Sequence, residues 1–181
     1  MKVVNVLTEC SGDKLTAIEK KFGSFARLQI ITLEEKAEIS NMSFDDFLPL
    51  ARQRIQAMRE SSIFHKEKSI CEILHLVTIK RGIFVVDGKM HLGAIVLITN
   101  EMTGVESISY AATVPLPRII VRTFEMPNTQ EHANELLQKV FPRWNTKDPI
   151  LTILTGENQV DWLVQSLNYS YRQFEYEKTT P

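Results

Sequence analysis

A pair of cations stands at a point in the sequence where strands commonly carry functional side chains. Lys80 and Arg81 interrupt the stretch VTIKRGIFVVDG and are followed directly by Gly82. The apolar run ICEILHLVTI before them predicts a buried strand that ends at these two residues. Their ammonium and guanidinium groups could bind a phosphate or another anion. The alternative is that they mark the edge of an ordinary hairpin.

The first predicted strand-to-helix junction offers a second group of chemically useful side chains. The stretch LTECSGDK places Thr8, Ser11 and Lys14 where a strand passes into a helix N-terminus. Free backbone N–H groups and the helix dipole attract anions at such a junction, which predicts a phosphate site. An ordinary capped helix is the alternative, and Glu9 and Asp13 favour it because they bring negative charge beside any phosphate.

An acidic pair opens the segment SFDDFLPLARQR. The carboxylates of Asp45 and Asp46 are hard oxygen ligands of the kind that Mg²⁺ prefers, with substrate phosphates as further ligands. Negative charge in the first turn of a helix also complements the helix dipole. The pair therefore predicts either a magnesium site or a stabilised helix start.

Neither cysteine nor histidine forms a recognisable site along the chain. Cys10 and Cys71 make no CxxC motif and no disulfide framework, which is typical of reduced thiols in a cytosolic protein. The histidines at 65, 75, 91 and 132 are scattered, and His75 stands on an apolar alternation that predicts a sheet-face position rather than a metal ligand. A Cys/His nucleophile pair remains open, because its members would meet in space and not in sequence.

Length and composition predict one globular domain that spans residues 1–181. Hydrophobic residues make up 44% of the chain and charged residues 24%, which excludes a disordered or fibrous class. The net charge of −1, without a basic block, favours neither nucleic acid nor an anionic membrane as a partner. No apolar window approaches the roughly 18 residues of a membrane span, and the N-terminus does not resemble a signal peptide. We therefore expect a soluble, cytoplasmic protein.

Strands and helices follow one another in an order that predicts an α/β fold, a mixed sheet flanked by helices. The strand predictions rest on short β-branched and apolar runs between turn residues, and they cover residues 2–8, 26–33, 69–80, 82–88, 89–99, 104–114 and 149–155. The helix predictions rest on apolar residues at helical spacing and on capping residues, and they cover residues 10–23, 43–61, 115–124, 129–141 and 159–174.

These segments, taken in order, resemble the inosine/xanthosine triphosphatase family, whose members hydrolyse abnormal purine nucleoside triphosphates. The family's first loop, Thr-x-Asn-Pro-x-Lys, is matched at Thr8 and Lys14 with one residue inserted. The remaining matches are the acidic pair, the Ala-Arg-Asn-Arg segment and the Pro-Leu-Pro, at residues 45–46, 51–54 and 115–117. The closing stretch ILTILTGENQVDWLVQSLNYSYRQF is also similar to the C-terminal domain of the proline-rich coiled-coil protein family, which is thought to share this fold without an established hydrolase activity.

The chain departs from the triphosphatase family at the catalytic cradle. The family's strand ends in Ile-Glu-Ala-Gly, and its metal-binding glutamate is replaced here by Lys80. A lysine cannot ligate Mg²⁺, and phosphoryl transfer depends on the metal to neutralise developing charge. The family's asparagine is also missing, since Cys10 or Ser11 takes its place. The resemblance therefore implies the inosine-triphosphatase-like fold, with a central cleft and a homodimer, but a catalytically impaired site.

The function expected from this resemblance is that of a binding module for a purine nucleotide or another anion, or for a protein. The residues that it nominates are Lys14 and Asp46 for catalysis, Asp45 and Asp46 for Mg²⁺, and, for the nucleotide, Thr8, Ser11, Lys14, Arg54, Lys80 and Arg81. The alternative is an active, Mg²⁺-dependent nucleoside-triphosphate pyrophosphatase with a rearranged metal site that also uses Glu72. A third reading leaves the cleft empty, with Lys80 held by an ion pair to Asp46, and assigns the function to the surface.

Overall fold

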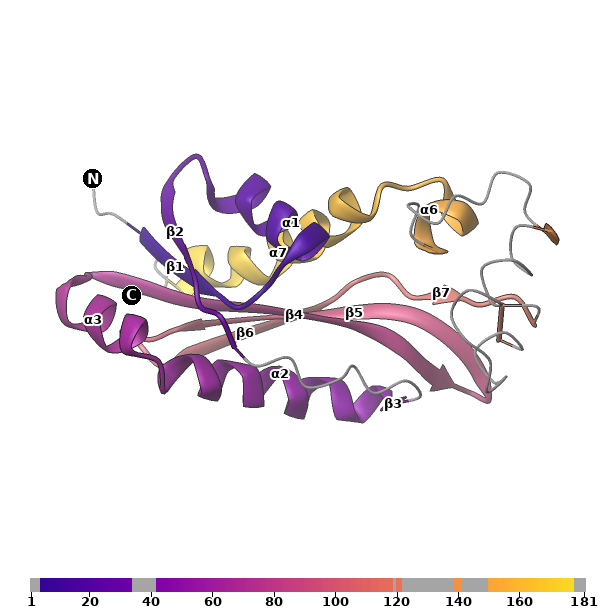
Figure 1. Ribbon diagram of the computed structural model, residues 1–181, viewed down its shortest axis with the longest axis horizontal. Helices are drawn as coiled ribbons and strands as arrows, with labels where there is room; N and C mark the ends of the chain where they lie inside the picture. Colours follow the sequence, from indigo (N-terminus) through magenta and orange to yellow (C-terminus); the bar gives the residue numbers. More distant parts are fainter. Residues whose placement is uncertain (1–3, 34–41, 119, 122–138, 141–149, 178–181) are drawn as a thin grey trace.

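The computed structural model describes residues 4–33, 42–118, 120–121, 139–140 and 150–177, and this part is built on one mixed sheet (Figure 1). Its strands are β1 (Val4–Thr8), β2 (Ala26–Ile30), β3 (Met42–Ser43), β4 (Ile73–Val86), β5 (Lys89–Asn100), β6 (Val105–Tyr110) and β7 (Val114–Pro115). The main order is β2-β1-β4-β5-β6. β1 pairs in parallel with β2 and β4, whereas β5 pairs antiparallel with β4 and β6. β3 adds to β4 in parallel, and β7 adds to β5 antiparallel.

Helices cover both faces of this sheet, as Figure 1 shows. They are α1 (Gly12–Phe22), α2 (Phe44–Arg59), α3 (Ser62–Ile70), α6 (Ile150–Thr155) and α7 (Gln159–Glu177). α1 and α7 pack on one face, and α2 runs along the other, followed by α3. The α/β fold predicted from the sequence, a mixed sheet flanked by helices, is therefore confirmed. Among the helices that the structure describes, not one combines the length and the apolar character that crossing a lipid bilayer requires.

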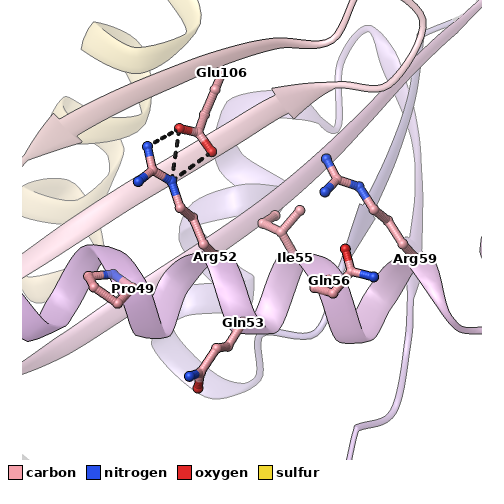
Figure 2. A pocket seen from close by; sticks show the side chains of 7 residues that line it. All are labelled: Pro49, Arg52, Gln53, Ile55, Gln56, Arg59 and Glu106. Carbon is pink, nitrogen blue, oxygen red and sulfur yellow. Dashed lines mark hydrogen bonds and ion pairs between the residues drawn. The ribbon is translucent and has the colours of Figure 1, made fainter.

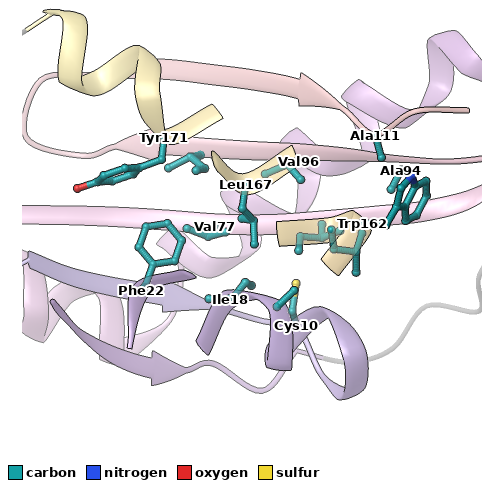
Figure 3. Close-up of a cluster of buried hydrophobic side chains, with 14 of the residues drawn as sticks. Cys10, Ile18, Phe22, Val77, Ala94, Val96, Ala111, Trp162, Leu167 and Tyr171 are labelled. Atoms are coloured by element: carbon teal, nitrogen blue, oxygen red, sulfur yellow. The ribbon is translucent and has the colours of Figure 1, made fainter. Parts of the chain in front are cut away.

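The apolar stripes of α1 and α7 fill the core on their face of the sheet (Figure 3). Ile18 and Phe22 of α1 lie one turn apart and are fully buried. Leu163 and Leu167 of α7 are likewise one turn apart and fully buried. Burial of one such side chain contributes roughly 1.5–3 kcal/mol to folding. The ring of Phe22 meets that of Tyr171 edge to face, with centroids 5.3 Å apart. This packing fixes α1, and with it the loop that precedes α1, against the sheet.

Serine hydroxyls dock α7 on the edge strand β6. Ser107 and Ser109 of β6 donate hydrogen bonds to the backbone oxygens of Ser170 and Ser166, each at 2.6 Å. The hydroxyl of Ser170 in turn donates to that of Ser109 at 2.8 Å. All these hydroxyls are buried, so their hydrogen bonds avoid the cost of unpaired polar groups in the core.

Two glycines let aromatic rings of the α2 face approach the sheet closely. Gly82 of β4 and Gly93 of β5 lie opposite each other in the strand register. A Cβ atom at Gly82 would lie 2.9 Å from the ring of Phe47, and one at Gly93 would lie 2.2 Å from the ring of Phe84. These two rings pack edge to face with centroids 5.4 Å apart. Only a residue without a side chain therefore fits at Gly93.

The strand end predicted at Lys80 is wrong, because β4 continues through Gly82 to Val86. The pairing with β1 stops at Val77, and the pairing with β3 starts only at Phe84. Between these points β4 pairs with β5 on one side alone among the described strands. Half-buried cations can therefore stand in the middle of this strand without being enclosed by the sheet.

Helix α3 was not expected from the sequence, which predicts a strand from residue 69 onward. Ser61 caps α3 by accepting a hydrogen bond from the backbone N–H of Phe64 at 3.1 Å. Glu67 of α3 is buried and accepts from the side-chain amide of Asn5 in β1 at 3.0 Å and from the thiol of Cys71 at 3.3 Å. The helix is thus anchored by polar contacts that sequence periodicity does not reveal.

The strand predicted over residues 149–155 is also wrong, since Ile150–Thr155 form α6. A short run of leucine, isoleucine and threonine is compatible with either structure. Here Leu151 is fully buried, and the hydroxyl of Thr155 donates to the backbone oxygen of Leu151 at 2.8 Å, one helical turn back. Of the helix predicted over 115–124, residues 118, 120 and 121 are helical, and of that over 129–141 only 139 and 140 lie within the described residues.

Candidate functional site

The candidate site lies where β1 ends beside the middle of β4. Thr8 is the last residue of β1 and stands opposite Val77, so the loop that follows runs beside the next residues of β4. The hydroxyl of Thr8 accepts a hydrogen bond from the backbone N–H of Cys10 at 3.1 Å and turns the chain. Gly12 has a φ of +55°, which glycine adopts at little cost, and α1 begins there.

A hydrogen bond ties this loop to β4. The hydroxyl of Thr78 donates to the carboxylate of Glu9 at 2.5 Å. Thr78 is fully buried, whereas Glu9 is half-buried. Side chains alternate along a strand, so Thr78 and Lys80 project from the same face of β4, the face that α2 covers. The carboxylate of Glu9 is therefore held beside the position of Lys80.

Lys80 lies among other charged groups. Burial lowers the pKa of the half-buried Lys80, and the positive charges of Arg54 and Lys14 lower it further, whereas the carboxylate of Glu9 opposes the shift. Lys80 makes no ion pair within the part of the chain that the structure describes. Lys14 of α1, Arg54 of α2 and Glu9 thus lie within electrostatic range of Lys80. Such a concentration of positive charge suits an anionic ligand.

Cys10 stands next to this cluster but is not a suitable nucleophile. Its side chain is 3% exposed and belongs to the core beneath α1. Burial raises the pKa of the Cys10 thiol to about 11, and the nearby Glu9 raises it as well. The thiol is therefore protonated near neutral pH and carries little of the reactive thiolate. A Cys/His nucleophile pair at this cysteine is disfavoured for the same reason.

The other residues nominated around the junction take different places. Thr8 is fully buried, and its hydroxyl is used in shaping the loop. Ser11 is the exposed N-cap residue of α1, without a side-chain capping hydrogen bond. Asp13, expected to oppose a phosphate, accepts from the amide of Gln159 at 2.7 Å and so joins α1 to α7. Arg81 projects from the face of β4 opposite to Lys80 and does not join its cluster from the same side.

The acidic residues nominated for Mg²⁺ do not gather around Lys80. Asp45 and Asp46 are exposed in the first turn of α2, and Asp46 precedes Arg54 by about 12 Å along the helix axis. Glu72 precedes the start of β4, whereas α2 begins beside the far end of that strand, roughly 40 Å away along the strand. Within the described ranges no three acidic, histidine or cysteine side chains come together as metal ligands. The rearranged magnesium site with Glu72 therefore does not fit this arrangement.

Thr78 and Glu9 are the site residues whose link the sequence did not reveal. Glu9 appeared only as a charge unfavourable to phosphate, and Thr78 appeared only as part of an apolar strand. The usable signal was the two-residue spacing between Thr78 and Lys80, which places both on one face of a strand. The contact with Glu9 additionally requires the strand register in which Thr8, the last residue of β1, pairs with Val77 of β4.

A separate pocket of about 370 Å³ opens between α2 and β6, away from this cluster (Figure 2). The guanidinium of Arg52 forms two-point hydrogen bonds with Glu106 of β6, the shortest at 2.5 Å. Further along α2, Arg59 binds Glu101 in the same manner at 2.8 and 3.0 Å. The two arginine–glutamate pairs thus fasten α2 to the antiparallel half of the sheet, and the Arg52–Glu106 pair forms part of the pocket wall.

Replacing Glu101 by glutamine is expected to lower the free energy of unfolding by about 1–2 kcal/mol at pH 7. The side chain of Glu101 is 6% exposed; burial alone would raise its pKa, but hydrogen bonds from Arg59 and Thr99 outweigh burial and lower it. This carboxylate stabilises the protein above its ordinary pKa of 4.5, and the contribution is lost as the pH falls through the lower folded-state pKa. Urea unfolding at pH 7 and pH 3 measures the difference.

The matched control for Glu101→Gln is Glu106→Gln, which breaks the more exposed pair with Arg52. That control is expected to change the free energy of unfolding by about 0.5 kcal/mol or less. Equal losses of stability in both variants would contradict the assignment of this stabilisation to the buried, ionised carboxylate of Glu101. A loss for Glu101→Gln that persists at pH 3 would contradict it as well.

The fold, but not the sequence, of this chain is similar to that of a protein of known structure. No protein-family model matches the sequence, and no curated protein matches it. A solved structure described as the crystal structure of protein VC0702 from Vibrio cholerae matches with a TM-score of 0.67 over 99% of this chain and 99% of that chain. The two sequences are 12% identical, so the likeness shows the fold alone.

Proposed function

We propose that this chain is a diverged relative of the inosine/xanthosine triphosphatases that binds the polyphosphate of a purine nucleotide without a metal ion and does not hydrolyse it at an enzymatic rate. The observation that carries the proposal is that Lys14 and Arg54 lie close enough to the half-buried Lys80 for their charges to lower its pKa. Lys80 stands where the family resemblance expects a metal-binding glutamate. A cation at this place supplies the charge that Mg²⁺ would otherwise bring to a phosphate.

The chemistry of these side chains explains binding better than turnover. Lysine and arginine donate charge-assisted hydrogen bonds to phosphate oxygens, and these bonds are about twice as strong as neutral ones. Hydrolysis would also need an activated water and neutralisation of the developing charge by a metal. The acidic residues that could hold that metal are divided between the first turn of α2, with Asp45 and Asp46, and the start of β4, which Glu72 precedes. The homodimer that the resemblance implies remains part of the proposal.

The proposal predicts binding of ITP, XTP and inorganic tripolyphosphate in the presence of EDTA, with no gain in affinity on addition of Mg²⁺. Mg²⁺ is expected to add no affinity because three protein cations already offset the ligand charge. Isothermal titration of the full chain measures the affinity in both conditions. Release of phosphate or pyrophosphate is expected to stay far below about 1 s⁻¹, the lower end of ordinary turnover numbers.

Three other results would count against the proposal. Binding that requires Mg²⁺, or turnover near 1 s⁻¹ or above, would restore the alternative of a Mg²⁺-dependent nucleoside-triphosphate pyrophosphatase. Absence of binding in both conditions would assign the function to the protein surface.

A further inference from the structure

A polar cluster joins α3 to the sheet at the end of the molecule where β4 starts (Figure 1). It consists of the amide of Asn5 in β1, the carboxylate of Glu67 in α3 and the thiol of Cys71, the C-cap residue of α3. We infer that this cluster binds a Zn²⁺ ion through the Cys71 sulfur, a Glu67 carboxylate oxygen and the Asn5 amide oxygen. The cluster is separate from the candidate anion site, because Asn5 pairs with Leu74, roughly 20 Å along β4 from Lys80.

The carboxylate of Glu67 is the first reason to expect a cation in this cluster. Glu67 is 1% exposed, and within the described residues it forms no ion pair. The side-chain amide of Gln29 and the thiol of Cys71 lower its pKa against the effect of burial, so the group is negatively charged near neutral pH. Arg27 and Lys66 attract it only from a longer range. Buried charges in proteins are as a rule paired with an opposite charge or bound to a metal ion.

The side chain of Asn5 is the second reason. Its amide nitrogen donates hydrogen bonds to Glu67 at 3.0 Å and to the sulfur of Cys71. Asn5 is 6% exposed, and its buried amide oxygen accepts no hydrogen bond from the described residues. An unpaired oxygen of this kind costs free energy in a protein interior. Rotation about the Cβ–Cγ bond exchanges the two amide atoms and turns this oxygen toward the carboxylate and the thiol, where a cation satisfies it.

The separations in the cluster come close to those between ligands of one tetrahedral zinc ion. Zn²⁺ binds thiolate at about 2.3 Å and carboxylate oxygen at about 2.0–2.2 Å, which places neighbouring ligand atoms about 3.3–3.6 Å apart. The sulfur of Cys71 lies 3.3 Å from Oε2 of Glu67, and the Asn5 amide nitrogen lies 3.0 Å from the same oxygen. The Asn5 amide also contacts the sulfur, so it has to swing outward as the ion enters. Cys71 is half-buried, which lets a water molecule reach the fourth ligand position.

The types of ligand favour Zn²⁺ over Mg²⁺. Thiolate is a soft ligand that suits Zn²⁺, whereas Mg²⁺ requires hard oxygen ligands in an octahedral arrangement. Binding breaks the S–H bond of Cys71, forms a Zn–S bond and releases the proton to solvent. The thiolate and the carboxylate of Glu67 together neutralise the two charges of the ion. Within the described residues no third acidic, histidine or cysteine side chain joins the cluster, so an amide oxygen completes the protein ligands.

Titration of the full chain with Co²⁺, a coloured substitute for Zn²⁺, tests the inference. We expect one ion per chain, a thiolate-to-cobalt charge-transfer band in the near ultraviolet and tetrahedral d–d bands in the visible, all of which disappear when Zn²⁺ is added. Cys71→Ser is expected to abolish the charge-transfer band and to weaken binding by about a hundredfold or more, since loss of a group that only supports a ligand already weakens binding about 10–100-fold. Cys10→Ala is the control, because it removes a thiol in the core on the opposite face of the sheet and should leave both the band and the affinity unchanged.

A second variant tests the role of Asn5 and stays informative if Cys71→Ser folds poorly. Asn5→Asp replaces the amide oxygen by a charged oxygen on a side chain of the same shape, so we expect it to bind Co²⁺ about tenfold more tightly. Without metal the variant is expected to be less stable than the unmodified chain, because two carboxylates then lie side by side. If Asn5 acted only as a hydrogen-bond donor to Glu67, stability would fall without a gain in affinity. Urea unfolding in EDTA and in Zn²⁺ measures the stabilities, and circular dichroism confirms that each variant is folded.

Three results would overturn the inference. They are the absence of Co²⁺ binding by the unmodified chain, a charge-transfer band that survives in Cys71→Ser, and a Co²⁺ affinity of Asn5→Asp that is unchanged or lower. Co²⁺ binding that is lost in His65→Ala would also overturn it, because His65 is an exposed residue of α3 outside the cluster. Tripolyphosphate binding is measured in EDTA and involves other residues, so the zinc site and the proposed function can fail independently.

Discussion

Tripolyphosphate binding is expected to weaken by about a hundredfold or more when Lys80 is replaced by glutamate. The change removes a positive charge from a half-buried position beside Lys14 and Arg54 and places a negative charge there, next to Glu9. At about 5 Å and an effective dielectric constant of 20, each unit of charge corresponds to about 3 kcal/mol. Titration calorimetry in EDTA gives the dissociation constants of the two proteins.

Two variants separate the local effect of Lys80 from a general effect of charge. Lys80→Met keeps much of the aliphatic stem and removes only the charge, so an intermediate loss is expected. Lys89→Glu makes the same reversal on an exposed residue at the turn between β4 and β5, roughly 20 Å along the strand, and should change the affinity less than twofold. An unchanged affinity in Lys80→Glu would place the ligand elsewhere.

The largest loss of stability is expected from Gly93→Ala, about 3 kcal/mol or more in the free energy of unfolding. The new methyl carbon would lie 2.2 Å from one ring carbon of Phe84 and 2.7 Å from another. The ring has little room to move, because Phe84 is 1% exposed, packs edge to face against Phe47 and stacks on His91. Urea unfolding at neutral pH measures the change.

A graded series makes this prediction specific. Gly82→Ala brings its methyl group to 2.9 Å from the outermost ring atom of Phe47, so a smaller loss is expected. In a Phe84→Leu background the space above Gly93 is larger, and the added cost of Gly93→Ala should fall. Equal costs in both backgrounds would show that the ring of Phe84 is not the cause.

The sequence predicted the elements whose apolar residues recur with a clear period. Leu163, Leu167 and Tyr171 have the spacing of a buried helical stripe, and α7 follows it. Prediction from the sequence failed where one residue pattern is compatible with two structures, as in α6. It also failed at Lys80, where two cations before a glycine read as the end of a strand. A strand can carry charge in its middle when its neighbour has already ended, and that depends on the pairing of β1, which no local pattern encodes.

Only part of the candidate site was predictable from the sequence, because strand pairing also decides which side chains meet there. Lys14 was nominated from the strand-to-helix junction and Arg54 from the family resemblance, and both lie within electrostatic range of Lys80. Arg81 was nominated as its neighbour in sequence, but adjacent residues of a strand face opposite ways. Asp46 was nominated as the partner of Lys80, whereas the opposing carboxylate in the structure is that of Glu9. Strand register and helix position, rather than residue type, decide which charges meet.

The long hairpin of β4 and β5 and the candidate site differ in the entropic cost of forming their contacts. The strands of the hairpin pair with each other from Val86 with Lys89 back to His75 with Asn100, across a turn of two residues, so this pairing can extend step by step from the turn. The site instead joins Glu9 to Thr78 across a sequence separation of 69 residues. Closing so long a loop has an entropic cost that pairing over a short separation does not carry, and contacts of this kind slow folding. An anion that binds at this junction would stabilise one of the long-range contacts of the fold.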